Sequence, residues 1–339
     1  MISSLPNNST TERLIKFLEE RKLSNKIIQL TPDASIREYF RITWEGQSAI
    51  ACVYPLDEQG ATQFNACLDV TQVFLSAGLP VAKIFFYDEE KKIIIHEDFG
   101  DTLLREVFLK STQAERQRLM DESIGLIARI QAATSRAFQM NSIASRLKFD
   151  KAKLLWELQF FKTHYFESFL KKPLSANEDE KLLSEFCEIC EELEKRARYL
   201  THRDFHAANL MYHEGKIKII DHQDARIGAA SYDLVSLLLD RITEKPSAEF
   251  LREKRRLFLT QRESIGLEKI DEEEFANEFE LQTIQRCLKA IGTFSYQSVF
   301  RNKKAYTQFI KPMFSAVLES CETLNRFPNL QKIIRKQIA

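Results

Sequence analysis

Residues 201–224 read THRDFHAANLMYHEGKIKIIDHQD, and this stretch decides which fold the chain can have. The segments NLMYHEG and KIKIID lie on either side of the turn at Gly215, which predicts a hairpin of two short strands. Asp204 and Asn209 come just before the hairpin, and Asp221 comes directly after its second strand. The three polar residues are therefore expected on loops around one hairpin, with separations of five and seventeen residues (209 − 204 and 221 − 204).

These residue types are the ones that phosphoryl transfer requires. One carboxylate positions the attacking hydroxyl and accepts its proton, while an amide oxygen and a second carboxylate hold the magnesium ion that bridges the nucleotide phosphates. Asp221 follows an apolar run, so its side chain sits at the end of a short strand, where it can be aimed into a cleft. The spacing predicts a site for magnesium and a nucleotide.

Before this stretch, short strand patterns dominate the chain. Strands are predicted at 27–30, 39–43, 48–54, 83–88 and 91–98, with a helix over 63–79 between the third and the fourth and a short amphipathic helix over 10–23 in front. After FGD at 99–101 the apolar residues recur at helical spacing, for example over 120–130 and 151–170. The patterns predict a strand-rich front part and a helical back part, with a boundary near residues 97–101.

The composition limits the function classes. The chain has 339 residues, and 49 basic residues balance 49 acidic ones, which removes the electrostatic argument for a nucleic-acid or membrane-surface partner. The N-terminus lacks the features of a secretory signal, and no window holds about 18 uninterrupted apolar residues. We expect a soluble, cytoplasmic protein of unknown oligomeric state.

The pattern HxDxxxxN at 202–209, followed by IDxxDA at 220–225 and YDL at 232–234, resembles the aminoglycoside phosphotransferase and choline kinase superfamily. Proteins of that superfamily have a fold that resembles the protein kinases. The resemblance implies an α+β, two-lobed chain that uses ATP and Mg²⁺. Residues 1–97 would form a small antiparallel five-stranded N-lobe that binds nucleotide, and residues 98–339 a larger helical C-lobe with the catalytic loop and the acceptor site.

Carried over to matching positions, the resemblance gives each polar residue a role. Asp204 resembles the catalytic base, and Asn209 and Asp221 resemble the metal ligands. His202 resembles the residue that braces the catalytic loop, and Asp233 the aspartate that supports this loop from the start of a helix.

Three further residues are candidates for substrate binding, each with an alternative. His206 either orients phosphate or caps the loop, and Asp224 supports either the metal site or the turn that follows. Glu157 lies in a helix with an aromatic stripe, where it can bind sugar hydroxyls or belong to the core. His222 stands where related sequences often have an aromatic residue, which indicates packing.

Several short segments narrow the resemblance to bacterial cell-wall sugar kinases. They are DASIREYFRITW at 33–44, HEDFGD at 96–101, LLWELQFFKTHYF at 154–166, IDHQDARIG at 220–228 and QRCLKAIGTF at 285–294. Those enzymes phosphorylate N-acetylmuramate and N-acetylglucosamine at the anomeric hydroxyl during peptidoglycan recycling. The resemblance implies an amino-sugar acceptor, ATP as the donor and a sugar 1-phosphate as the product.

Two segments that are expected to bind nucleotide differ from the protein-kinase sequence pattern. The first loop, DASIREYF, has no glycine, so backbone amides and Ser35, with charge from Arg37 or Arg41, are expected to bind the phosphates. The third strand, SAIACVYP, has no lysine, and the sequence leaves the compensating cation open. Main-chain groups of Glu97 to Phe99 are expected to bind adenine at a hinge between the lobes.

Other functions remain open at this point. The same fold could serve a different acceptor, such as an aminoglycoside or choline, and an aminoglycoside pocket should be rich in acidic residues. The missing lysine also allows a pseudokinase that binds nucleotide without turnover. The sequence does not distinguish ATP from GTP.

Overall fold

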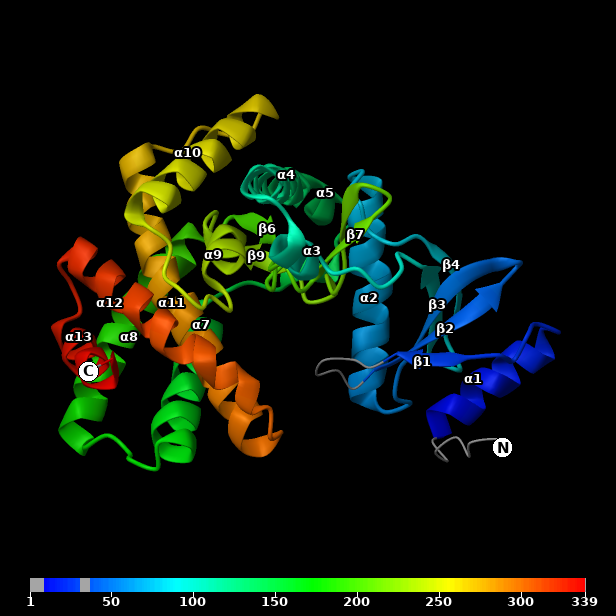
Figure 1. Ribbon diagram of the computed structural model, residues 1–339, viewed down its shortest axis with the longest axis horizontal. Helices are drawn as coiled ribbons and strands as arrows, with labels where there is room; N and C mark the ends of the chain where they lie inside the picture. The colour runs from blue at the N-terminus through cyan, green and yellow to red at the C-terminus, as the bar shows by residue number, and fades with distance from the viewer. Residues whose placement is uncertain (1–8, 31–36, 339) are drawn as a thin grey trace. The chain divides into compact units, whose positions relative to one another are not determined.

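The computed structural model describes residues 9–30 and 37–338 of the chain (Figure 1). The chain divides into two compact units. The first consists of Met1–Leu109 with Leu210–Asp224, and the second of Lys110–Asn209 with Ala225–Ala339. The predicted division at residue 97 into a nucleotide-binding and an acceptor-binding part concerns function, and it stays a prediction.

The first unit contains the predicted sheet. Its described strands are β1 (Ile28–Leu30), β2 (Glu38–Trp44), β3 (Gln47–Val53), β4 (Ile84–Asp88) and β5 (Ile93–Glu97), arranged in the order β1-β2-β3-β5-β4 with antiparallel neighbours throughout. Helix α1 (Ser9–Glu20) precedes the sheet, and α2 (Glu58–Ser76) lies between β3 and β4 in sequence. The predicted order of strands and helices is confirmed. Helix α2 begins five residues earlier than predicted, because the Asp57 side chain caps it by accepting a hydrogen bond from the Gly60 amide at 2.8 Å.

Helices α1 and α2 cover opposite faces of the sheet (Figure 1). Ala51 and Val53 of β3 belong to the same buried cluster as Phe17 of α1, whereas Cys52 belongs to the cluster that contains Phe64 of α2. Successive side chains of a strand point to opposite faces, so a strand that is apolar at consecutive positions needs cover on both sides of the sheet. This explains why β3 reads as a continuous apolar segment.

The predicted hairpin of β7 (Leu210–His213) and β8 (Lys216–Ile219) is confirmed, and it packs within the first unit. Glu214 and Gly215 both have positive φ, 48° and 75°, as a tight two-residue turn requires. The Tyr212 amide donates to the Thr102 carbonyl at 2.9 Å. The hairpin therefore places Asp221 in the same unit as the five-stranded sheet, although Asp221 lies 124 residues after the end of β5 in sequence (221 − 97 = 124).

The second unit is mainly helical, as predicted. Its described elements are α4 (Gln113–Ala132), α5 (Thr134–Gln139), α6 (Ile143–Arg146), α7 (Lys151–Lys162) with a π-helical continuation (Thr163–Phe169), α8 (Ala176–Arg196), the paired strands β6 (Tyr199–Thr201) and β9 (Arg226–Gly228), α9 (Tyr232–Leu239), α10 (Ala248–Ser264), α11 (Glu272–Phe300), a 3₁₀ turn (Lys304–Phe309), α12 (Ile310–Leu324) and α13 (Pro328–Ile338). Helix α3 (Leu104–Lys110) joins the units in sequence. Among the described residues, no helix combines the length and apolarity that crossing a bilayer would demand.

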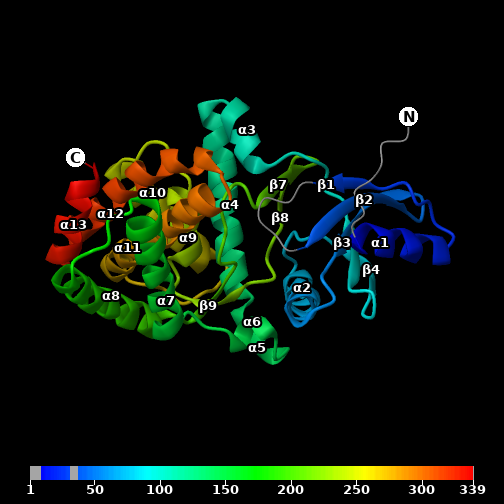
Figure 2. The same ribbon diagram turned by 90° about the horizontal axis from the view of Figure 1, so that it is seen from below.

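Helix α11 is the centre of this unit, where it packs against α7, α9 and α12 (Figure 2). Gly292 permits the close approach of α7, since a Cβ at this position would lie 2.6 Å from the Cα of Phe161. This contact holds together the two helices that carry Glu157 and Gln285.

Replacing Gly292 with alanine is expected to lower the free energy of unfolding by about 2–3 kcal/mol, because the backbone of α7 must move. Gly125→Ala is the matched control, since its Cβ would meet only the Gln261 side chain at 3.6 Å and alanine favours the helix. Denaturant titration of both variants measures the difference. Equal stabilities would show that α7 can shift without cost.

Candidate catalytic loop and metal ligands

The loop that follows β6 is fixed by Asp233, in the first turn of α9. Its carboxylate accepts hydrogen bonds from the His202 amide at 2.7 Å and the Arg203 amide at 3.0 Å. Burial raises the pKa of Asp233 to about 6, although these two amides favour its charged form. Arg203 has a φ of 84°, a conformation that costs energy outside glycine. The predicted supporting role of Asp233 is confirmed by these bonds.

His202 lies in the interior beneath the loop. It is fully buried, and its ring packs edge-on against Phe205 with 5.6 Å between the centroids. This position agrees with the predicted bracing role, because moving the ring would displace the backbone that precedes Asp204.

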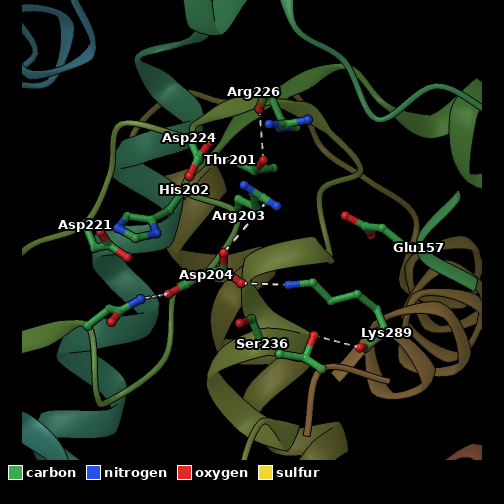
Figure 3. Close-up of polar contacts among 12 residues, drawn as sticks. Glu157, Thr201, His202, Arg203, Asp204, Asp221, Asp224, Arg226, Ser236 and Lys289 are labelled. Carbon is green, nitrogen blue, oxygen red and sulfur yellow. Dashed lines mark hydrogen bonds and ion pairs between the residues drawn. The ribbon is translucent and has the colours of Figure 1, made fainter. Parts of the chain in front are cut away.

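Asp204 lies in a cluster of positive charge (Figure 3). Its Oδ1 accepts hydrogen bonds from Arg286 at 3.0 Å and from Lys289 at 2.9 Å, and Oδ2 lies 3.8 Å from Arg203. Burial alone would raise the pKa of Asp204, but Lys289, Arg203 and Arg286 outweigh it and hold this pKa well below its ordinary value. The carboxylate is therefore ionised at neutral pH and fixed in one orientation.

Arg286 and Lys289 are functional candidates that the sequence analysis missed. Arg286 also contacts Asp240 at 3.1 Å and the Ser236 hydroxyl at 3.0 Å, so it is held from three sides. A signal for both was present in QRCLKAIGTF, where two cations stand three residues apart, on one helix face, in a mostly apolar segment. Buried cations at such spacing need an anionic partner.

Asn209 is oriented by its own loop. Its Nδ2 donates to the Asp204 carbonyl at 3.0 Å, and its backbone amide donates to the His206 carbonyl at 2.8 Å. Because the amide nitrogen is used in this way, Oδ1 is the atom that can serve a metal ion. The geometry fits a hard oxygen ligand.

Asp221 follows β8 with a φ of 60°, a left-handed conformation that aspartate tolerates better than most residues other than glycine and asparagine. Its Oδ1 accepts hydrogen bonds from Arg37 at 2.7 Å and from Gln223 at 3.2 Å, and its side chain is 39% exposed. The carboxylate is partly exposed, and both of these bonds fall on one oxygen. The second oxygen suits Mg²⁺, which prefers carboxylate ligands.

Arg37 and Arg41 were equal candidates for binding phosphate from the sequence, but the structure gives them different partners. Arg37 is buried beside Asp221, whereas Arg41 bonds Asp98 at 2.7 Å and Asp101 at 2.8 Å. Arg41 therefore fastens β2 to the segment after β5, and its charge is already balanced by two carboxylates. Ser35 lies outside the described residues.

The predicted adenine-binding segment ends β5. The Glu97 amide donates to the Lys83 carbonyl at 2.9 Å, so this donor is used within the sheet. Phe99 is buried and packs against the His213 ring with 5.7 Å between the centroids. We therefore expect other main-chain groups of residues 97–99 to contact adenine. These contacts stay a prediction.

Glu157 is buried on α7, where Gln285 of α11 donates to its Oε2 at 2.9 Å. Asp224 accepts a hydrogen bond from Gln223 at 3.3 Å, which agrees with a supporting role in the turn. His222 packs as predicted: it stacks on Phe74, and its Nε2 lies 2.7 Å from the Thr71 hydroxyl.

His206 is buried in the same loop as Asp204. Burial lowers the pKa of His206 to about 4, so the ring is neutral near pH 7. A neutral ring cannot bind phosphate as a cation, which favours loop support or a neutral hydrogen bond to substrate.

Acidification is expected to destabilise the folded protein through His206. Its pKa is about 6.5 in the unfolded chain and about 4 in the folded one, so the stability it confers is present above pH 6.5 and is lost as the pH falls towards 4. Between pH 7 and pH 5 the wild-type protein is expected to lose about 2 kcal/mol more than His206→Asn. Denaturant titrations at both pH values test this, and parallel losses would contradict it.

The sequence profile of the phosphotransferase enzyme family matches residues 26–272. Curated proteins with similar sequences are named N-acetylmuramate/N-acetylglucosamine kinase. The protein from Neisseria meningitidis serogroup B is 27% identical over 268 residues, which is 78% of this chain and 76% of that protein. The protein from Pseudomonas aeruginosa is 27% identical over 278 residues, which is 80% of this chain and 76% of that protein.

Solved structures with the same fold include a choline kinase from Cryptosporidium parvum, with a TM-score of 0.60 and 14% identity over 93% of this chain and 96% of that one. An ADP-bound aminoglycoside phosphotransferase has a TM-score of 0.57 and 15% identity over 91% of this chain and 98% of that one. These likenesses establish the protein-kinase-like α+β fold and leave the acceptor undecided.

Proposed function

The chain belongs to the phosphotransferase enzyme family, and on that premise we propose that it is an ATP-dependent kinase that phosphorylates the anomeric hydroxyl of N-acetylmuramate or N-acetylglucosamine. The names of its curated relatives support this acceptor. The observation that carries the proposal is Asp204, an ionised carboxylate held by Arg286 and Lys289 in a loop that Asp233 anchors.

Asp204 acts on the acceptor hydroxyl. A carboxylate with so low a pKa is a weak base in the ground state, but phosphoryl transfer needs little proton removal before the transition state. Asp204 orients the hydroxyl towards the γ-phosphorus and takes its proton as the new oxygen–phosphorus bond forms and the bond from the γ-phosphorus to the oxygen of the leaving ADP breaks. Positioning and charge thus account for most of the rate.

Asn209 and Asp221 are proposed to hold Mg²⁺ through their carboxamide and carboxylate oxygens, with ATP as the donor. When bound, the ion neutralises charge on the nucleotide phosphates. The donor set contains only hard oxygen atoms, which this ion prefers.

Arg37 is proposed as the cation that replaces the missing lysine of β3. Its guanidinium is buried, lies 2.7 Å from Asp221 and is 5.9 Å from the ring centroid of Tyr54, which follows β3. A cation beside a metal ligand is well placed to bind the phosphates that share the metal. Arg41 has a structural role instead, since its guanidinium is paired with Asp98 and Asp101.

The positive charges around Asp204 also limit which class of acceptor can bind. Arg203, Arg286 and Lys289 lie near the carboxylate, so its surroundings are basic. An aminoglycoside carries several positive charges and choline carries one, and both would be repelled here. A neutral or anionic sugar fits these surroundings.

Phosphate transfer from ATP with Mg²⁺ tests the proposal directly. The acceptors are N-acetylmuramate, N-acetylglucosamine, kanamycin, choline and a blank without acceptor, and ³¹P NMR locates the phosphate in each product. We expect an anomeric phosphate on one or both amino sugars. Transfer only to kanamycin or choline would overturn the acceptor, and nucleotide binding without transfer to any compound would favour a pseudokinase.

A further inference from the structure

Helix α7 presents Lys153, Trp156 and Glu157 close together, because residues three and four apart lie on one helix face. The first turn of this helix is fixed by Asp150, whose side chain accepts a hydrogen bond from the Lys153 amide at 2.7 Å. The Lys153 ammonium lies 4.0 Å above the Trp156 ring and 3.7 Å from Oε1 of Glu157. Its position is thus set by an aromatic face and a carboxylate.

Glu157 has an unused acceptor. Only 1% of the residue is exposed, and Gln285 donates to Oε2, but Oε1 accepts no hydrogen bond from the described part of the chain. A buried carboxylate oxygen without a donor is costly. A hydroxyl group of a ligand would satisfy it.

Lys153 lies among other positive charges. Burial is the main cause of its lowered pKa, and Arg203, Arg226 and Lys289 lower it further, against the opposing effect of Glu157. Its side chain is 26% exposed, so the ammonium can be reached from outside. An anion placed here would gain attraction from several cations at once.

This group of residues is connected to the catalytic loop through α11. Gln285, which holds Glu157, is followed in sequence by Arg286, which holds Asp204. Glu157 and Lys289 lie on the same side of Asp204 (Figure 3). Lys289, which bonds Asp204, also interacts electrostatically with Glu157 and Lys153, so a molecule bound to Lys153 and Glu157 would lie near the proposed catalytic carboxylate.

We propose that Lys153 and Glu157 form the acceptor subsite and select an amino sugar that carries a carboxylate: Lys153 binds the carboxylate, and Oε1 of Glu157 accepts a hydrogen bond from a ring hydroxyl. Trp156, which is 53% exposed, offers an aromatic surface for the apolar face of the sugar. The inference rests on the proposed function. It predicts that N-acetylmuramate, which has a lactyl carboxylate, is a better substrate than N-acetylglucosamine, which has none.

Lys153→Met tests the charge, because methionine keeps the length of the side chain and removes its ammonium group. We expect kcat/KM for N-acetylmuramate to fall about 10-fold or more, while that for N-acetylglucosamine changes less than about twofold. Lys153→Arg should restore most of the preference. Lys151→Met is the matched control, since Lys151 lies on the same helix and pairs with Glu191 at 2.6 Å.

The outcomes separate the two proposals. An equal loss for both sugars, or a loss for neither, would overturn the role of Lys153 while the kinase reaction itself stands. Phosphorylation of neither sugar by the wild-type protein would overturn the proposed function and this inference with it. Glu157→Gln adds a second check: it should raise KM for both sugars, because both have the ring hydroxyls.

Discussion

Asp204→Asn is expected to lower kcat by about 10³-fold or more, while nucleotide binding and the fold remain intact. The variant keeps an oxygen that can accept from Lys289 but loses the charge that orients the hydroxyl and takes its proton. Arg286 keeps its contacts with Asp240 and Ser236, so the interior retains its partners. The measurements are single-turnover transfer from ATP, nucleotide affinity and circular dichroism.

Asp179→Asn provides the matched control for this experiment. Asp179 also accepts a short hydrogen bond from a lysine, Lys162 at 2.6 Å, but it is partly exposed on α8. Surface ion pairs contribute little, so this variant should retain full activity. Turnover by Asp204→Asn at the wild-type rate would show that another group positions the hydroxyl.

Arg37→Ala is expected to reduce kcat/KM for ATP by about 100-fold. The substitution removes the buried cation beside Asp221, so the carboxylate keeps its bond from Gln223 but loses its ion pair, and the bound phosphates lose their proposed cation. Arg37→Lys should recover part of the loss, since lysine supplies the charge without the planar pair of donors. ATP saturation curves at fixed Mg²⁺ measure the effect, and the acceptor KM should change little.

Arg41→Ala is the comparison for the second prediction. Loss of its bonds to Asp98 and Asp101 should lower stability, by about 1–2 kcal/mol, more than it lowers the affinity for ATP. A larger ATP defect in Arg41→Ala than in Arg37→Ala, with the fold intact, would reverse the two roles.

Local patterns in the sequence determined much of this fold. Short segments rich in β-branched and aromatic residues, separated by turn residues, predicted the strands of the sheet, because such side chains favour the extended backbone of a strand. Gly215 marked the hairpin turn, since a tight two-residue turn needs positive φ. The order of Asp204, Asn209 and Asp221 around this hairpin gave the candidate site, because their separations are fixed by the chain itself.

The tertiary structure decided which cations serve which carboxylates. Arg286 and Lys289 meet Asp204 across 82 and 85 residues of sequence. Arg37 and Arg41 stand four residues apart near the same strand, so no local pattern distinguishes them. Arg37 contacts Asp221, 184 residues away, whereas Arg41 contacts Asp98, 57 residues away. Contacts between residues so distant in sequence depend on how whole helices and strands pack. The periodicity of one segment does not predict that packing.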